Sequence, residues 1–165
     1  TDQVWSRPLG LGGLWGAMVE EWLNELLPDD ADAICRDRVH LLVLRIWPRP
    51  FKRQPLSDFS SKEDLISSCM ASVHIPYFMN KRFSARHRGR RYVDGSFMAG
   101  RKALSLGESK PTVYFDYNDD EAMKERRRNF LSLTDREGLL FMRRKGYEHV
   151  QAMIAEGKLD SLDDA

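Results

Sequence analysis

The chain has 165 residues, of which 42% are hydrophobic and 31% are charged, and this length suffices for one domain with a buried core. Its formal net charge of +1 excludes a global attraction for nucleic acid or for an acidic partner. Two cysteines, Cys35 and Cys69, form neither a disulfide framework nor a metal-ligand spacing, which favours a reducing compartment. No apolar run approaches the ~18 residues of a membrane span, and no signal peptide pattern is visible.

The first third of the sequence predicts two helices and a strand. Residues 14–27 carry apolar side chains at helical spacing, which predicts an amphipathic helix stopped by Pro28. The apolar positions are Trp15, Met18, Trp22 and Leu26. Residues 29–37 predict a short helix, and residues 38–46, RVHLLVLRI, predict a strand buried on both faces. The next segment, 47–55, contains three prolines and reads as a loop.

The middle of the sequence begins with a helix-start signature. Ser60 with Glu63 three residues later forms a capping box, so residues 57–72 predict a helix. Its expected buried stripe is Leu65, Ile66, Cys69 and Met70. Pro76 ends this helix, since proline pushes the preceding residue into an extended conformation. Residues 81–95 predict two short strands joined by a turn at Arg88-Gly89, and residues 112–117 predict another strand.

The C-terminal third is strongly charged and predicts two helices, 118–130 and 134–158. Thr134 and Glu137 form a second capping box, and Gly157 is the expected stop. One face of the second helix carries Leu139, Met142, Val150 and Met153. Helices alternating with strands indicate an α/β or α+β class.

Most motifs that would carry chemistry do not fit. The histidines lie far apart and near no carboxylate or cysteine at ligand spacing, so neither a metal nor a cofactor is expected. No serine has glycine two residues before it and two after it, as a nucleophile elbow requires. One basic strip has no acid among its cations and is open to phosphates of nucleic acid or lipid headgroups, although a solvated hairpin is the favoured interpretation. Its cations are Lys81, Arg82, Arg86, Arg88, Arg90 and Arg91.

Two stretches of the sequence resemble a known family. DFSSKEDLISSCMASVHIPYFM, residues 58–79, followed by RGRRYVDGSF, residues 88–97, resembles the C-terminal part of the patatin-like phospholipase domain. The resemblance covers roughly residues 10–100. It implies the C-terminal portion of a patatin-like α/β hydrolase sheet flanked by helices, in residues 1–110, followed by a helical C-terminal extension in residues 111–165.

The resemblance also implies a mechanism, in which a serine from a Gly-x-Ser-x-Gly elbow attacks a lipid ester and an aspartate accepts its proton. Asp94 matches that aspartate and Gly95 the glycine after it. Ser96 stands where the family has glycine or alanine, and its hydroxyl can bond Asp94 and weaken it as a proton acceptor. The elbow and the oxyanion loop are absent, and the chain starts at Thr1, so we expect the back half of an active site, inactive alone.

The resulting prediction is part of a triacylglycerol lipase or phospholipase, intracellular and either cytoplasmic or peripheral on a membrane or lipid droplet. The alternative is a non-catalytic module that docks on lipid surfaces through the basic strip. Nucleic-acid binding through the same strip is a third possibility, although no nucleic-acid partner is expected because aromatic side chains are sparse there.

Overall fold

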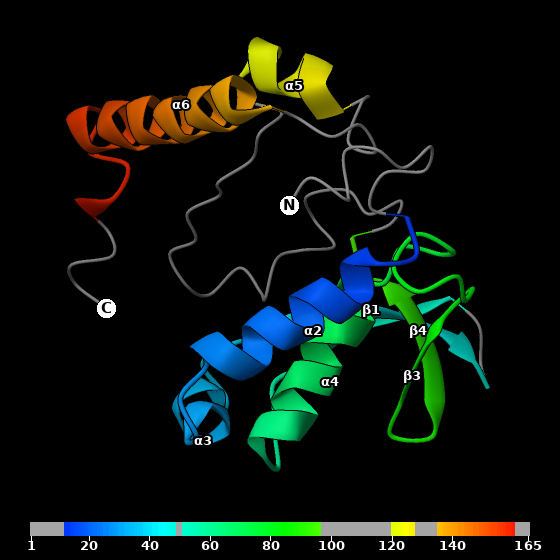
Figure 1. Cartoon of the computed structure of the whole chain (residues 1–165). Coiled ribbons are helices and arrows are strands. Elements are labelled where there is room, and N and C mark those ends of the chain that lie inside the picture. The colour runs from blue at the N-terminus through cyan, green and yellow to red at the C-terminus, as the bar shows by residue number, and fades with distance from the viewer. Residues whose placement is uncertain (1–11, 49–50, 97–119, 128–134, 161–165) are drawn as a thin grey trace. The chain divides into compact units, whose positions relative to one another are not determined.

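The computed structural model describes residues 12–48, 51–96, 120–127 and 135–160 (Figure 1). The chain divides into two compact units, Leu11–Leu104 and Thr1–Gly10 with Ser105–Ala165. The expected boundary at residue 110 and the strand expected at residues 112–117 lie outside the described residues. No helix among the described residues is long and apolar enough to cross a membrane.

The larger unit is built on a four-stranded antiparallel sheet with the strand order β2-β1-β4-β3. Its strands are β1, Leu41–Trp47; β2, Lys52–Leu56; β3, Ala85–His87; and β4, Arg90–Asp94. The central strand β1 is buried on both faces at its middle, where Val43 and Leu44 point to opposite sides and are both buried. The expectation for β1 is therefore confirmed at these two positions.

One side of the sheet carries helix α4, Lys62–Ser72, which contacts β1, β3 and β4. Two further helices contact α4 in turn: α2, Trp15–Leu26, and α3, Ala31–Cys35 (Figure 1). The hydrophobic core lies where these elements meet. Its buried residues are Ala31, Val43, Leu56, Phe59, Leu65, Ala71 and Tyr92. The described part of this unit thus combines a small sheet with helices, as an α/β class requires.

The helix expected at residues 14–27 is present, but its expected apolar face is not its buried face. Trp22 is 42% exposed and Leu26 is 80% exposed. The residue that α2 buries is Gly16, whose N–H donates to the Met79 carbonyl oxygen over 2.9 Å. A Cβ at Gly16 would lie 2.7 Å from that same oxygen, so the glycine permits a close backbone approach.

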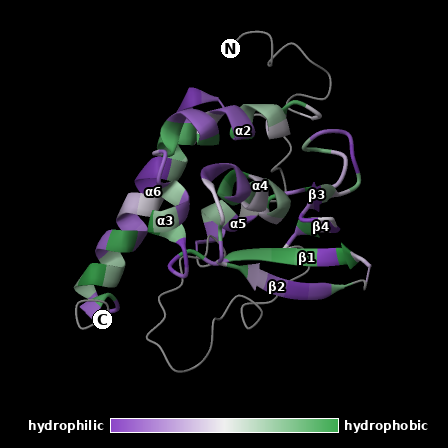
Figure 2. Cartoon of the chain, turned by 90° about the horizontal axis from the view of Figure 1, so that it is seen from below, coloured by the Kyte–Doolittle hydropathy of each residue, from purple (hydrophilic) through white to green (hydrophobic). Residues whose placement is uncertain are grey.

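The prediction of a loop at residues 47–55 is wrong in part, because residues 52–56 form strand β2. This strand lies at the edge of the sheet and pairs with β1 on one side only. Pro55, which has no backbone N–H, is tolerated there because no strand on the other side requires a hydrogen bond from it. Figure 2 shows β1 as mostly hydrophobic and β2 as mostly hydrophilic, as expected of a central and an edge strand. The hairpin expected at residues 81–95 is confirmed: Arg88 and Gly89, with φ of 44° and 71°, form the two-residue turn between β3 and β4.

Helix α4 is present, but its cap lies one residue later than expected. Ser61 is the N-cap, and its hydroxyl accepts a hydrogen bond from the Asp64 N–H over 3.2 Å. Leu65 and Ile66 are buried as expected, whereas Cys69 and Met70 are half-buried. Ser68 and Ala71 fill the remaining buried positions of α4.

The smaller unit contains α5, Glu121–Arg127, and α6, Arg136–Ala155. The N-cap of α6 is Asp135, whose carboxylate accepts from the Gly138 N–H over 2.8 Å, and not Thr134 as expected. On the expected apolar face, Met153 is buried and Leu139 is exposed. The stop at Gly157 is confirmed: its φ is 66°, and Gly157 and Lys158 donate to Ile154 and Met153 in a Schellman arrangement.

Candidate active site

Asp94 is the last residue of β4 and lies at one end of the sheet. It is opposite Val43 of the central strand, and its side chain is half-buried. Its backbone N–H donates to the carbonyl oxygen of His74, in the segment after α4, over 2.9 Å. The carboxylate therefore stands at a strand end that both a neighbouring strand and the segment after α4 hold in place.

Gly95 fixes the turn that follows. A Cβ at this position would lie 2.0 Å from the Leu42 carbonyl oxygen and 2.6 Å from the Val43 nitrogen, so only glycine fits beside β1. Ser72 supports the same place, since its hydroxyl donates to the Leu42 oxygen over 2.7 Å. Arg53 of β2 donates to the Gly95 carbonyl oxygen over 3.2 Å. Three elements, β1, β2 and α4, thus determine the backbone path just after Asp94.

Ser96 bonds the carboxylate of Asp94 in the way considered from the sequence. Its hydroxyl donates to Asp94 Oδ1 over 2.6 Å, and its backbone N–H donates to the same oxygen over 2.7 Å. Both bonds stabilise the ionised carboxylate and hold its plane. Within the described residues, Oδ2 receives no hydrogen bond. The two bonds to Oδ1 therefore fix the orientation of the carboxylate at the strand end.

The six cations of the basic strip differ in their surroundings, because Arg88 is bound to a carboxylate of α4. Its guanidinium binds both carboxylate oxygens of Asp64, with Nε 3.0 Å from Oδ1, and it also donates to the Asp58 carbonyl oxygen. Arg91 lies opposite Arg86 in the β3–β4 pair and donates to the Ser84 hydroxyl over 3.4 Å. The strip is therefore spread over the hairpin and the segment before it, and within the described residues Arg88 is its one cation in an ion pair.

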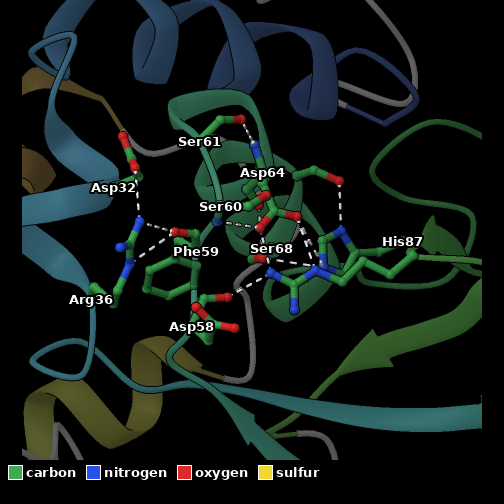
Figure 3. Close-up of polar contacts among 11 residues, drawn as sticks. Asp32, Arg36, Asp58, Phe59, Ser60, Ser61, Asp64, Ser68 and His87 are labelled. Atoms are coloured by element: carbon green, nitrogen blue, oxygen red, sulfur yellow. Dashed lines mark hydrogen bonds and ion pairs between the residues drawn. The ribbon is translucent and has the colours of Figure 1, made fainter.

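Asp64 is the centre of a polar network that the sequence did not reveal (Figure 3). Besides Arg88, its Oδ2 accepts from the Ser60 N–H over 2.9 Å. The hydrogen bonds from Arg88 hold the pKa of Asp64 far below its usual range, against the opposing effect of burial. Because Arg88 lies 24 residues further along the chain, no local spacing could have indicated this pair.

His87 is the second buried member of this network (Figure 3). Its Nδ1 lies 2.9 Å from the Ser67 hydroxyl, and its Nε2 lies 3.2 Å from the Ser68 hydroxyl. Ser68 donates its own proton to the Asp64 carbonyl oxygen over 2.8 Å, so its oxygen accepts from His87 Nε2–H. Burial lowers the pKa of His87, so the ring is neutral and its 3.9 Å approach to the Asp64 carboxylate is not an ion pair.

These serines, with His87 and Asp64, place the residue types of a catalytic triad together without forming one. Ser67 and Ser68 lie inside α4, where the helix uses the backbone N–H groups that would bind an oxyanion. Ser68 is fully buried. For Ser68, the carboxylate approaches the same ring nitrogen that Ser68 bonds, whereas a triad needs the acid on the opposite nitrogen. For Ser67, the carboxylate is on the opposite nitrogen, but it lies 3.9 Å away, beyond hydrogen-bond distance, and Arg88 binds both of its oxygens. The network instead joins α4 to the β3–β4 hairpin. Within the described residues, no cluster of three potential metal ligands occurs.

The chain is similar to three known proteins over about half of its length. It is similar to human patatin-like phospholipase domain-containing protein 4, at 26% identity over 93 residues, which are 56% of this chain and 36% of that protein. It is also similar to the omega-hydroxyceramide transacylases of human and mouse, at 29% and 28% identity over 80 residues. These 80 residues are 48% of this chain but only 14% and 13% of the transacylases.

The matches confirm the resemblance to the patatin-like family that the sequence motifs indicate. The matched segment spans well under half the length of each of these relatives. No family model matches the chain. No solved structure matches it either.

Proposed function

We propose that this chain supplies the proton acceptor of a patatin-like lipid acyl hydrolase, with Asp94 acting on a serine that lies outside these residues. None of its own serines has the glycine flanks of a nucleophile elbow. The named relatives include a phospholipase-domain protein and transacylases, so the acyl group passes either to water or to another hydroxyl. The substrate class is a lipid carboxylic ester.

One observation carries the proposal: the carboxylate of Asp94 stands at a strand end whose following residue must be glycine. A Cβ at position 95 would lie 2.0 Å from the Leu42 carbonyl oxygen, which explains why glycine follows Asp94 at the end of this strand. An ordinary surface turn would not need β1, β2 and α4 around it. The rigid surroundings are what a general base requires, because proton transfer depends on a fixed distance to the nucleophile.

In the proposed reaction the serine oxygen attacks the ester carbonyl carbon while Asp94 Oδ2 takes the serine proton. The carbonyl π electrons move to the oxygen, which becomes the oxyanion of a tetrahedral intermediate. Collapse of that intermediate breaks the ester bond, and the proton on Asp94 passes to the leaving alkoxide. Meanwhile Oδ1 stays bound to the hydroxyl and N–H of Ser96, which keep the carboxylate plane fixed.

The test begins with the protein's sequence before Thr1, where a Gly-x-Ser-x-Gly elbow is expected. In the protein that includes this serine, Asp94→Asn should lower kcat by three orders of magnitude or more, because general-base activation is lost. Asp37→Asn is the matched control, since Asp37 is exposed, has φ of 57° and uses only its backbone N–H and so tolerates asparagine. An Asp94→Asn protein with unchanged kcat would overturn the proposal.

A second candidate function is a non-catalytic module that docks on lipid surfaces. Exposed aromatic and basic side chains in the segment between α4 and β3 favour it, as do the hydrogen bonds of Ser96 to the carboxylate. The absence of an elbow serine from the protein's own sequence would favour this candidate. The 165-residue chain alone should show no turnover of a short-chain p-nitrophenyl ester under either proposal; turnover lost in Asp94→Ala would contradict both.

A further inference from the structure

The segment between α4 and β3 presents two aromatic rings to solvent. Tyr77 is 65% exposed and Phe83 is 53% exposed, although both are large hydrophobic side chains. Their ring centroids lie 5.9 Å apart, so the two rings form one small apolar patch. Lys81 and Arg82, both exposed, lie between them in the sequence. We call residues 77–83 the aromatic-basic loop.

The backbone of the aromatic-basic loop is held in a defined shape. The Tyr77 N–H donates to the Arg82 carbonyl oxygen over 2.8 Å, and the Lys81 N–H donates to the Tyr77 oxygen over 3.2 Å. The side chain of Met79, within the loop, is buried, and its carbonyl oxygen accepts a hydrogen bond from the Gly16 N–H of α2. Tyr77 and Lys81 both have positive φ, which turns the chain sharply at the two positions. The exposed rings are therefore presented by a fixed loop.

The sequence on both sides of the loop carries charge of one sign. No aspartate or glutamate occurs between residues 74 and 93. Within the described residues, Lys81 and Arg82 make no ion pair, whereas Arg88 is bound to Asp64. The loop thus combines an apolar patch with two cations that are open to an anionic surface. Aromatic rings beside basic side chains are the composition found where proteins meet the headgroup region of a bilayer.

His74 joins this loop to the candidate site. Its ring Nε2 lies 3.2 Å from the Arg82 carbonyl oxygen, to which it donates, and its own carbonyl oxygen accepts from the Asp94 N–H over 2.9 Å. His74 is buried, and burial lowers the pKa of its ring, which keeps the ring neutral. One buried residue therefore bonds both the backbone of the loop and the strand end that carries Asp94.

We propose that the aromatic-basic loop docks this chain on an anionic lipid bilayer, with Tyr77 and Phe83 entering the headgroup region and Lys81 and Arg82 binding lipid phosphates. The docking would bring ester bonds at the membrane surface to the end of the sheet where Asp94 stands. That consequence rests on the proposed function, whereas the docking itself does not. A nucleic acid is disfavoured because the two rings are tilted by 55° to each other and so form no parallel platform for successive bases.

The test is cosedimentation of the 165-residue chain with vesicles, either of phosphatidylcholine alone or of equal parts phosphatidylserine and phosphatidylcholine. We expect binding to the anionic vesicles that weakens as salt is added. Lys81→Asn with Arg82→Gln should weaken it roughly 30-fold, since each cation near an anionic surface contributes about fivefold. Tyr77→Asn with Phe83→Asn should weaken it roughly tenfold, and this loss should persist at high salt.

The matched control is Phe51→Asn with Arg38→Gln. Phe51 is 78% exposed with φ of 61°, so it has the exposure and backbone conformation of Tyr77. Arg38 is an exposed cation of the same unit. The control should bind anionic vesicles like the unchanged chain, and the far-ultraviolet circular dichroism of every variant should match that chain.

Three results would overturn the proposal: no binding to anionic vesicles, an equal loss in the control, or binding to duplex nucleic acid with no binding to vesicles. Asp94→Asn should bind vesicles like the unchanged chain, because its backbone N–H keeps the bond to His74. Failure of docking and failure of the proposed catalysis therefore give different results: the first appears in sedimentation and the second only in turnover by the protein that contains the serine.

Discussion

Two aspartates of the sheet unit, Asp64 near the start of α4 and Asp94 at the end of β4, differ in what their carboxylates bind. Both carboxylate oxygens of Asp64 accept hydrogen bonds, from Arg88 and from the Ser60 N–H. Asp94 has both its bonds on Oδ1, and within the described residues Oδ2 has none. The first carboxylate holds two elements together, and the second is the one to which we assign the proposed proton transfer.

The comparison shows why residue type alone is a poor guide to the site. Asp64 lies with His87 and two serines, the set of groups that most suggests catalysis, yet every one of them is committed to joining α4 and the hairpin. Asp94 lies near none of these groups, and within the described residues its Oδ2 accepts no hydrogen bond. Whether the two carboxylates have the different roles described can be tested by four changes, taken from the largest expected effect to the smallest.

Gly95→Ala should have the largest effect, because its new Cβ meets the backbone of β1 and backbone atoms cannot move aside as a flexible side chain can. We expect the free energy of unfolding to fall by about 3 kcal/mol or more in urea denaturation. Gly146→Ala in α6 is the control, since nothing lies within 4 Å of its Cβ and alanine favours a helix. A Gly95→Ala chain as stable as the unchanged chain would show that the turn after Asp94 is not constrained.

Asp64→Asn should lower the free energy of unfolding by about 2 kcal/mol, since the neutral side chain leaves Arg88 without its charged partner. This value lies below that of a fully buried pair because the Arg88 side chain is 41% exposed. Asp94→Asn should cost less than about 1 kcal/mol, because asparagine still accepts from the Ser96 N–H. Equal losses in the two variants would remove the distinction between a structural and a functional carboxylate.

The stability of the sheet unit should fall in acid in two steps. His74 and His87 have lowered pKa values through burial, so the unfolded chain binds protons first and stability declines as pH falls below ~6.5. The pKa of Asp64 is lowered by Arg88, so its contribution is complete above ~4 and is lost as pH falls further. Unfolding in urea across this pH range measures both steps. In Asp64→Asn the lower step should shrink; a lower step of unchanged size would contradict the assignment.

Ser96→Gly should have the smallest effect, on turnover alone. Removing the hydroxyl takes one of the two hydrogen bonds away from Oδ1, which should raise kcat up to roughly fivefold in the protein that contains the serine. Ser96→Ala tests the same bond without the added backbone freedom of glycine. A fall in kcat in both variants would mean that the positioning of the carboxylate by the hydroxyl matters more to turnover than the effect of the hydroxyl on proton acceptance.

Much of the fold follows from local signals in the sequence. The apolar run at β1, the Arg88-Gly89 turn and the Gly157 stop each depend on neighbouring residues, and each is present. β2 was missed because its proline reads as a loop until the edge position is known. The cap of α4 was misplaced by one residue because two adjacent serines precede two adjacent acids, and either pairing fits.

The candidate site divides in the same way. Asp94, Gly95 and Ser96 are adjacent in the sequence, so motif and turn chemistry suffice to single them out. The bond between His74 and Arg82, and the clamp between Asp64 and Arg88, join residues that only the folded chain brings together. The buried face of α2 was also missed, because a glycine makes its contact. The spacing of apolar side chains cannot indicate a face on which the contacting residue has no side chain.

The close packing of Gly95 against β1 has a consequence for how variants at this turn would be tolerated. Two neighbouring positions are constrained for unrelated reasons: Gly95 by the lack of space for a Cβ, and Asp94 by the proposed need for a carboxylate. In a library of single substitutions, most changes at Gly95 should reduce the amount of folded protein, whereas polar changes at Asp94 should leave that amount nearly intact. A screen that measures only the amount of folded protein would therefore detect changes at Gly95 and not at Asp94. Under the proposed function, a screen for turnover would detect changes at Asp94 as well.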